Sequence, residues 1–296
     1  MGCGLPFSGG SQPDADVARF QDFELVVTDD AQTDDTLPIL RSFTDQRIKL
    51  VELPSNLGIS GAMNATICRA RGEYVAVLNS DDWTFRYRLK AQVAFLDAHP
   101  NVGALFGLPV FVDDRDEPTE GLNDFTVPLR FPDFARVTWL RQFFFHGNCL
   151  CAPTAMIRRE VYQRVGGYDP HLTNLQDLDF SIRAVVEGFD LYVADRPITA
   201  FRVRDGQRNV SAPRMDTALR SDFELRQILR RYRGVRPIII SFVNRAARSL
   251  RPEAFSFPHL SGFFKADLGR TLPSDGARRT WIFPPCRSVG SRRALR

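Results

Sequence analysis

The 296-residue sequence lacks long apolar runs, an N-terminal export signal and paired cysteines. A membrane-crossing helix needs about 20 consecutive apolar residues, and no stretch approaches that length. No basic patch followed by an apolar run opens the sequence, so we expect no secretory signal. The five cysteines form no CxxC pair, which argues against a disulfide framework or a zinc site. Together these absences predict a cytoplasmic protein, with at most peripheral contact at the inner face of the plasma membrane.

Charge is unevenly distributed along a chain of otherwise ordinary composition. Hydrophobic residues make up 44% and charged residues 25%, which excludes fibrous and fully disordered proteins. Residues 1–200 hold 18 Lys or Arg against 28 Asp or Glu, whereas residues 201–296 hold 21 against 7. The acidic part is suited to hold a cation, and the basic part is suited to contact an anionic surface such as phospholipid or nucleic acid. A basic tail that is merely solvated is the alternative.

Short apolar runs alternate with helical patterns in the first part of the chain. Strands followed by helices indicate βαβ crossovers, and therefore an α/β fold with a mainly parallel sheet flanked by helices. Residues 1–19 read as a disordered lead, and segment 112–145 is less regular. A further helix is expected over residues 216–233. The other expected strands are 23–27, 48–53, 74–78, 102–111 and 191–193, and the other expected helices are 33–43, 58–70, 86–99 and 176–188. A second apolar stretch, 155–157, leads into residues 159–165.

Two of the predicted strands end in paired aspartates, Asp29-Asp30 and Asp81-Asp82. Ligands of open α/β sheets bind beyond the carboxyl ends of the strands. Adjacent carboxylates repel one another, and a divalent cation with oxygen ligands would relieve that repulsion. Magnesium or manganese bridging these carboxylates to a phosphate or diphosphate is the functional interpretation. Turn formation and helix capping by aspartate is the structural alternative.

A third acidic pair, Asp177 and Asp179, lies in a predicted helix. Residues two apart do not share a helix face, so we expect different roles, one as a general base and the other as a brace. Cys149 and Cys151 alternate as core residues of a strand would.

Several segments in order resemble glycosyltransferase family 2. They are residues 24–36 (ELVVTDDAQTDDT), 56–64 (NLGISGAMN), 70–82 (ARGEYVAVLNSDD) and 176–179 (QDLD), within a resemblance that covers about residues 20–205. Segment 70–82 is similar to the part of the family that contains the metal-binding DxD motif.

The resemblance implies a GT-A fold that transfers a sugar, with inversion, from a UDP-, GDP- or dTDP-sugar to a saccharide or lipid-linked acceptor. It implies no nucleic-acid partner. Asp177 would be the catalytic base, and Asp82 with Asp81 would hold Mn²⁺ or Mg²⁺. The nucleotide would be bound by Asp29, Asp30, Asn56, Asn64 and Asp81.

Departures from the family pattern leave other hypotheses open. The usual first strand and helix are not recognisable before residue 20, which would open a sheet edge and favours an inactive nucleotide-binding fragment or interaction protein. Arg204 stands where relatives often have a histidine. A nucleotidyltransferase is a further alternative, but it needs a Gly-rich phosphate loop that Gly9-Gly10 does not supply. A basic helical extension over 206–251 and an irregular basic tail over 252–296 complete the expected organisation.

Overall fold

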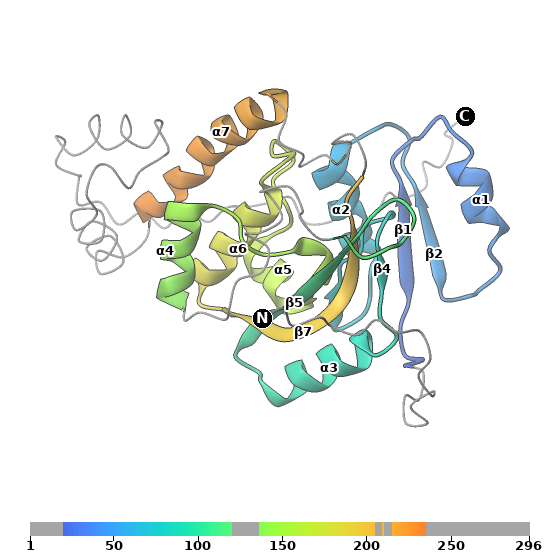
Figure 1. Ribbon diagram of the computed structural model, residues 1–296, viewed down its shortest axis with the longest axis horizontal. Coiled ribbons are helices and arrows are strands. Elements are labelled where there is room, and N and C mark those ends of the chain that lie inside the picture. Colours follow the sequence, from blue (N-terminus) through green and yellow to red (C-terminus); the bar gives the residue numbers. More distant parts are fainter. Residues whose placement is uncertain (1–19, 120–135, 205–208, 210–214, 235–296) are drawn as a thin grey trace, which may run out of the picture.

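The described part of the chain folds into strands backed by helices (Figure 1). The computed structural model describes residues 20–119, 136–204, 209 and 215–234. The strands are β1 Leu25–Asp29, β2 Ile48–Glu52, β3 Tyr74–Ala76, β4 Trp83–Thr84, β5 Val102–Val112, β6 Met156–Arg158 and β7 Asp190–Arg202. The helices are α1 Thr36–Ser42, α2 Gly58–Arg69, α3 Arg88–Ala98, α4 Arg136–His146, α5 Arg159–Val165, α6 Gln176–Glu187 and α7 Met215–Leu229, with short 3-10 turns η2 Ala152–Thr154 and η4 Arg230–Gly234.

The described strands form two sheets. Strands β1 and β2 pair in parallel, and the other sheet has the order β3-β6-β5-β7-β4. The two longest ladders, β1-β2 and β5-β7, are parallel, and three shorter ladders are antiparallel. The predicted α/β class is therefore confirmed, with short antiparallel strands added beside the parallel pairs.

The larger sheet is covered on both faces. Helices α4, α5 and α6 lie on one side of β5 and β7, and α3 lies on the other (Figure 1). Side chains of β5 alternate between the two hydrophobic clusters, with Ala104 and Phe106 facing one and Leu105 the other. This alternation follows from the period of two in a strand, and it buries β5 on both faces.

The split between the sheets leaves strand edges without partners. Among the described residues, β1 pairs only with β2, and β3 pairs only with β6. Val26 and Val27 of β1 and Val75 of β3 remain partly exposed, although such runs are buried in a continuous sheet. In the described ranges, β1 and β3 thus each keep one edge without a strand partner.

Some elements differ from the expectation. Helix α4 falls in the segment that was expected to be irregular, and β7 is longer than its apolar core, residues 191–193. Cys149 and Cys151 are free and buried as predicted, but they lie in a loop before η2. Cys68 is disulfide-bonded, which departs from the expectation. In the described ranges, no helix is both long and apolar enough to span a bilayer.

The ends of the predicted organisation lie outside the described residues. These are the lead 1–19 and the tail 252–296, and most of segment 206–251 also falls outside, with α7 and η4 as its described part.

Candidate active site

The Asp81-Asp82 pair lies in a tight turn between β3 and β4. The amide of Asp82 donates to the Asn79 carbonyl at 3.3 Å. One Asp82 carboxylate oxygen accepts from the backbone N–H of Arg202 at 2.9 Å, and the other accepts from the Asn79 side-chain amide at 3.0 Å. Burial raises the pKa of Asp82 to about 6, and the charge of Asp81 adds to this effect, while the hydrogen bonds oppose it. The Asn79 side chain thus orients Asp82.

Two arginines at the end of β7 surround this turn. The Arg202 guanidinium donates to the Asp81 carbonyl at 3.0 Å and to the Asp113 carbonyl at 2.7 Å, and it pairs with Asp116. The Arg204 guanidinium lies 3.3 Å from the Asp81 carboxylate, with its side chain 40% exposed. The turn after β5 therefore adds acidic groups, and β7 adds cations, beside the predicted metal-binding pair.

The donor set fits a divalent cation that is shared with a ligand. Nowhere in the described ranges do three or more His, Cys, Asp or Glu side chains gather into a metal site. Mg²⁺ commonly takes one or two carboxylates from the protein and its remaining ligands from substrate phosphates and water. Asp82 and Asp81 can supply that share, so a diphosphate would have to complete the coordination.

A buried guanidinium lies behind the turn. Arg88, at the start of α3, is 1% exposed, and no carboxylate contacts it in the described structure. Its acceptors are all neutral: the side chains of Gln92 and Thr199 at 2.9 and 3.1 Å, and the carbonyls of Val77 and Ala155 at 2.9 and 3.0 Å. Desolvation lowers its pKa to about 10, which leaves it charged at neutral pH. Arg88 thus connects β7 with the chain after β3 and before β6, and adds positive charge beneath Asp82.

Asp177 occupies the first turn of α6, where the helix dipole favours a carboxylate. One oxygen accepts from the Leu178 N–H at 2.8 Å and the other from the side-chain amide of Asn148 at 2.7 Å. Burial raises the pKa of Asp177 to about 6. Burial raises the pKa of the Cys151 thiol, and the charges of Asp82 and Asp177 add to this effect, so both carboxylates lie within electrostatic reach of that residue.

The loop before Asp177 is held by Glu224 of α7, which is 2% exposed. One oxygen of Glu224 accepts from the Thr173 N–H at 2.8 Å and its hydroxyl at 2.9 Å, and the other accepts from the N–H groups of Asn174 and Leu175 at 3.0 and 2.8 Å. Four donors of the loop 173–175 therefore converge on the Glu224 carboxylate, and this loop ends two residues before the proposed base. The sequence pattern did not indicate this contact, because about 50 residues separate the partners.

Asp179 has the bracing role that was expected of one member of its pair. Its buried carboxylate accepts from Arg183 at 2.8 Å and is also paired with Arg231. The Arg183 guanidinium continues to the carbonyls of Val165 and Gly167. Asp179 thus fixes α6 to its surroundings, while Asp177 remains only half-buried.

The predicted nucleotide contacts lie on or near the smaller sheet. Asp29 is 4% exposed, and its Oδ1 has no hydrogen-bond partner among the described residues. Asp30 accepts from the Leu57 N–H at 2.6 Å, and Asn56 accepts from the Gly58 N–H at 3.0 Å, which together shape the entry to α2.

Asn64 has a structural task in this state. Its amide exchanges two hydrogen bonds with the Tyr168 backbone, at 2.7 and 2.8 Å. No hydrogen bond or ion pair joins Asp29 or Asp30 to the Asp81-Asp82 turn in the described ranges, so these two pairs are not in contact.

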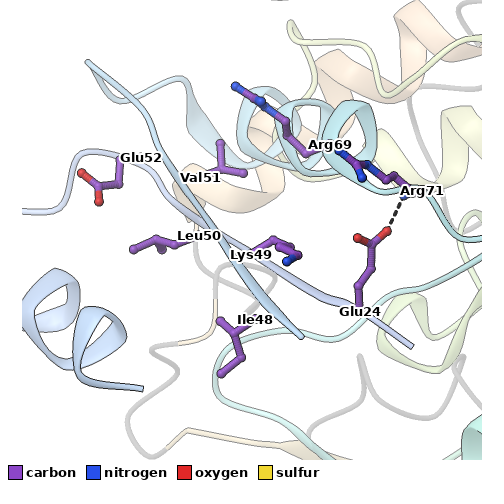
Figure 2. A pocket seen from close by; sticks show the side chains of 8 residues that line it. All are labelled: Glu24, Ile48, Lys49, Leu50, Val51, Glu52, Arg69 and Arg71. Carbon is purple, nitrogen blue, oxygen red and sulfur yellow. Dashed lines mark hydrogen bonds between the residues drawn. The ribbon is translucent and has the colours of Figure 1, made fainter. Parts of the chain in front are cut away.

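A pocket of about 490 Å³ lies elsewhere, along β2 and the end of α2 (Figure 2). Figure 2 shows Lys49, Arg69 and Arg71 around it, with the Arg71 N–H bonded to Glu24. None of its lining residues belongs to the predicted site.

The model of glycosyl transferase family 2 matches residues 15–166. The chain belongs to this family. The match contains β1, the Asp81-Asp82 turn and Asn148, and it ends before Asp177. In this family 2 member, Asp177, Arg202, Arg204 and Glu224 therefore lie outside the family match, and the structure alone places them.

Known relatives agree with this assignment. EpsE of Bacillus subtilis, named as a glycosyltransferase, is 29% identical over 178 residues, which cover 58% of this chain and 60% of that protein. TuaG of Bacillus subtilis, named for teichuronic acid biosynthesis, is 27% identical over 210 residues, which cover 70% of this chain and 77% of that protein. The matched region thus spans well under the full length of either relative.

The GT-A fold is also found in a solved relative. A mannosyltransferase from Pyrobaculum calidifontis, in complex with GDP-Man and Mn²⁺, gives a TM-score of 0.51 at 21% identity, covering 82% of this chain and 69% of that chain. At this identity the likeness concerns the fold alone.

Proposed function

We propose that this family 2 member is an inverting glycosyltransferase. It moves a sugar from a nucleotide-diphosphate donor to a hydroxyl acceptor during synthesis of cell-surface polysaccharide or lipopolysaccharide. The observation that carries the proposal is the half-buried Asp177, oriented by Asn148 and with its pKa raised to about 6. The name of TuaG supports the acceptor class.

Asp177 would act as the general base. A carboxylate whose pKa lies near 6 is ionised at neutral pH and is a stronger base than an ordinary aspartate. Asn148 and the Leu178 N–H leave lone pairs of the carboxylate free to accept the proton of the acceptor hydroxyl. Direct attack by that hydroxyl requires one base and no covalent intermediate, which accounts for inversion.

The Asp81-Asp82 turn would receive the diphosphate. These carboxylates would hold Mn²⁺ or Mg²⁺, which supplies Lewis-acid stabilisation of the leaving group. Arg204 supports the same role, because its partly exposed guanidinium adds positive charge at the mouth of the turn. Arg202 and Asn79 keep the Asp82 carboxylate oriented before any ligand arrives.

The nucleoside would bind toward the smaller sheet. The buried Asp29 Oδ1 is an acceptor without a partner in the described structure, and an N–H group of a base or a ribose hydroxyl would satisfy it. Asp30, Asn56 and Asn64 are the further proposed contacts, with UDP-, GDP- and dTDP-sugars as donor classes.

A catalytically inactive nucleotide-binding fragment or interaction protein is the second candidate. The observation that favours it is that β1, which ends at the proposed nucleoside contact Asp29, has one edge without a strand partner in the described ranges. It predicts that donor binding is weak or lost although the larger sheet is folded.

Calorimetric titration of UDP and GDP, with and without Mn²⁺, tests the proposal. We expect metal-dependent binding that Asp82→Ala abolishes and Asp177→Asn preserves, while Asp177→Asn removes sugar transfer. Asp45→Ala, which changes an exposed aspartate paired with Arg47, is the matched control for loss of a carboxylate. A folded chain that binds neither nucleotide under either condition would contradict the transferase proposal and leave the second candidate.

A further inference from the structure

The outer face of α7 carries the most exposed large apolar side chains in the described part of the chain. Met215 is 83% exposed, Leu219 69% and Phe223 62%. Their spacing of four residues places them in one row along the helix. A contiguous exposed apolar row of this kind marks an interaction surface, whereas single exposed apolar residues do not.

The same row continues into exposed cations. Arg226 lies three residues after Phe223 on the same side of α7, Arg230 begins η4 directly after the helix, and both arginines are exposed. Arg226 pairs with Asp222 at 2.9 Å, and Arg230 donates to Gln227 at 2.8 Å. Apolar side chains that lead into arginines along one helix face are typical of helices that lie in a lipid–water interface.

We propose that the exposed face of α7 formed by Met215, Leu219, Phe223 and Arg226, together with Arg230 at the start of η4, docks on an anionic lipid surface. Charge complementarity selects this occupant. The sequence that follows η4, residues 235–296, contains 12 Lys or Arg and 3 Asp or Glu. This segment folding back would bring like charges together at the arginines, whereas anionic headgroups attract both.

The inner face of α7 explains what docking would achieve. Glu224 on that face holds the loop of residues 173–175, which leads directly to Asp177. Figure 1 shows α7 at the periphery of the molecule, beside α4 and α6. Docking the outer face would therefore bring the loop before the base close to the bilayer, where a lipid-linked acceptor would be presented. This consequence rests on the proposed function, but the docking itself does not.

Exposed apolar residues on α1 provide a matched control. Ile39 and Phe43 are 57% and 58% exposed and are also four residues apart. Their surroundings are different, because Asp34 and Asp35 precede α1. The docking proposal therefore predicts that α7, and not α1, binds anionic lipid.

Cosedimentation of the full chain with vesicles tests the proposal, using pure phosphatidylcholine or a mixture with phosphatidylglycerol. We expect binding to the mixed vesicles that weakens at least about tenfold in Leu219→Asp/Phe223→Asp, because two buried apolar side chains are lost. Ile39→Asp/Phe43→Asp should bind as the natural chain does. Arg226→Gln/Arg230→Gln should lower affinity for mixed vesicles about tenfold or more without changing the weak affinity for neutral ones.

Other outcomes would overturn the proposal. Vesicle binding that the Leu219→Asp/Phe223→Asp variant retains in full would exclude this face as the docking surface. If the natural chain did not bind vesicles, a changed unfolding midpoint in that variant would assign the row to packing within the chain. A changed self-association constant would instead assign it to contact with a second copy. Nucleotide titration of the same variant separates the two proposals, since donor binding does not involve the outer face of α7.

Discussion

The Glu224 carboxylate provides the sharpest test of how α7 controls the proposed base. Glu224→Gln preserves shape and replaces one acceptor oxygen by an NH₂ group. Two of the four donors from residues 173–175 then face a donor instead of an acceptor. Hydrogen bonds to a buried charged group contribute about 1.5–3 kcal/mol each, so the free energy of unfolding should fall by about 3–5 kcal/mol. This is a large fraction of the total stability of a domain.

Urea unfolding and steady-state transfer measure the two consequences. We expect a lower unfolding midpoint and a lower kcat, because the loop before Asp177 loses its anchor, with unchanged donor affinity. The matched control is Glu187→Gln, which removes a 2.9 Å pair with Arg164 between exposed side chains and should cost about 0–1 kcal/mol. If both variants lost the same free energy, the four hydrogen bonds of Glu224 would not hold the loop, and the argument would be wrong.

Three further predictions concern the site and its supports. Because burial raises the pKa of Asp177 to about 6, kcat should rise with pH and level off above that value. The folded state binds this proton more tightly than the unfolded state, so the natural chain should lose about 1 kcal/mol more unfolding free energy from pH 5 to pH 7 than Asp177→Asn does. Equal losses in the two proteins would refute the shift. Arg88→Met should cost about 3–4 kcal/mol, since Val77, Gln92 and Thr199 lose a buried donor, whereas the exposed Arg86→Met should change the urea midpoint little. Gly167→Ala places a Cβ 2.2 Å from the Asn64 Oδ1 and should lower the free energy of unfolding by about 1–3 kcal/mol. The loss should be much smaller in an Asn64→Ala background, and additive losses would show that the clash is not with Asn64.

The sequence predicted the elements whose physics is local. Apolar runs ahead of the paired aspartates located β1 and β3, and the helix predicted over 176–188 is found as α6. Strand β4 was missed because two residues carry no pattern. Helix α4 was missed because its consecutive aromatics, residues 143–145, favour a strand by intrinsic propensity. Packing of Trp139 and Phe143 in the core fixes this segment as a helix instead.

The supports of the site could not be read from the sequence, because they join distant segments. Asn148 reaches Asp177 across 29 residues, and Arg88 reaches Thr199 across 111. Hydrogen bonds of this kind depend on how strands β3, β6 and β7 are ordered, and periodicity determines only the type of each element. The same holds for Arg202, whose position beside Asp82 follows from the β4-β7 pairing.

The two halves of the proposed site belong to parts of the fold that differ in how much of their surface is buried in a core. Asp177 and the Asp82 turn are attached to the five-stranded sheet, which has a core on both faces. The proposed nucleoside contacts Asp29 and Asp30 lie at the end of β1 in the β1-β2 sheet, where helix α1 has no buried residue. Regions with few buried contacts open locally at low free energy, and binding to such a region costs the free energy of ordering it. Weak donor affinity in a folded chain would therefore reflect the β1-β2 half, and would leave the base, its Asn148 partner and the Glu224 anchor intact.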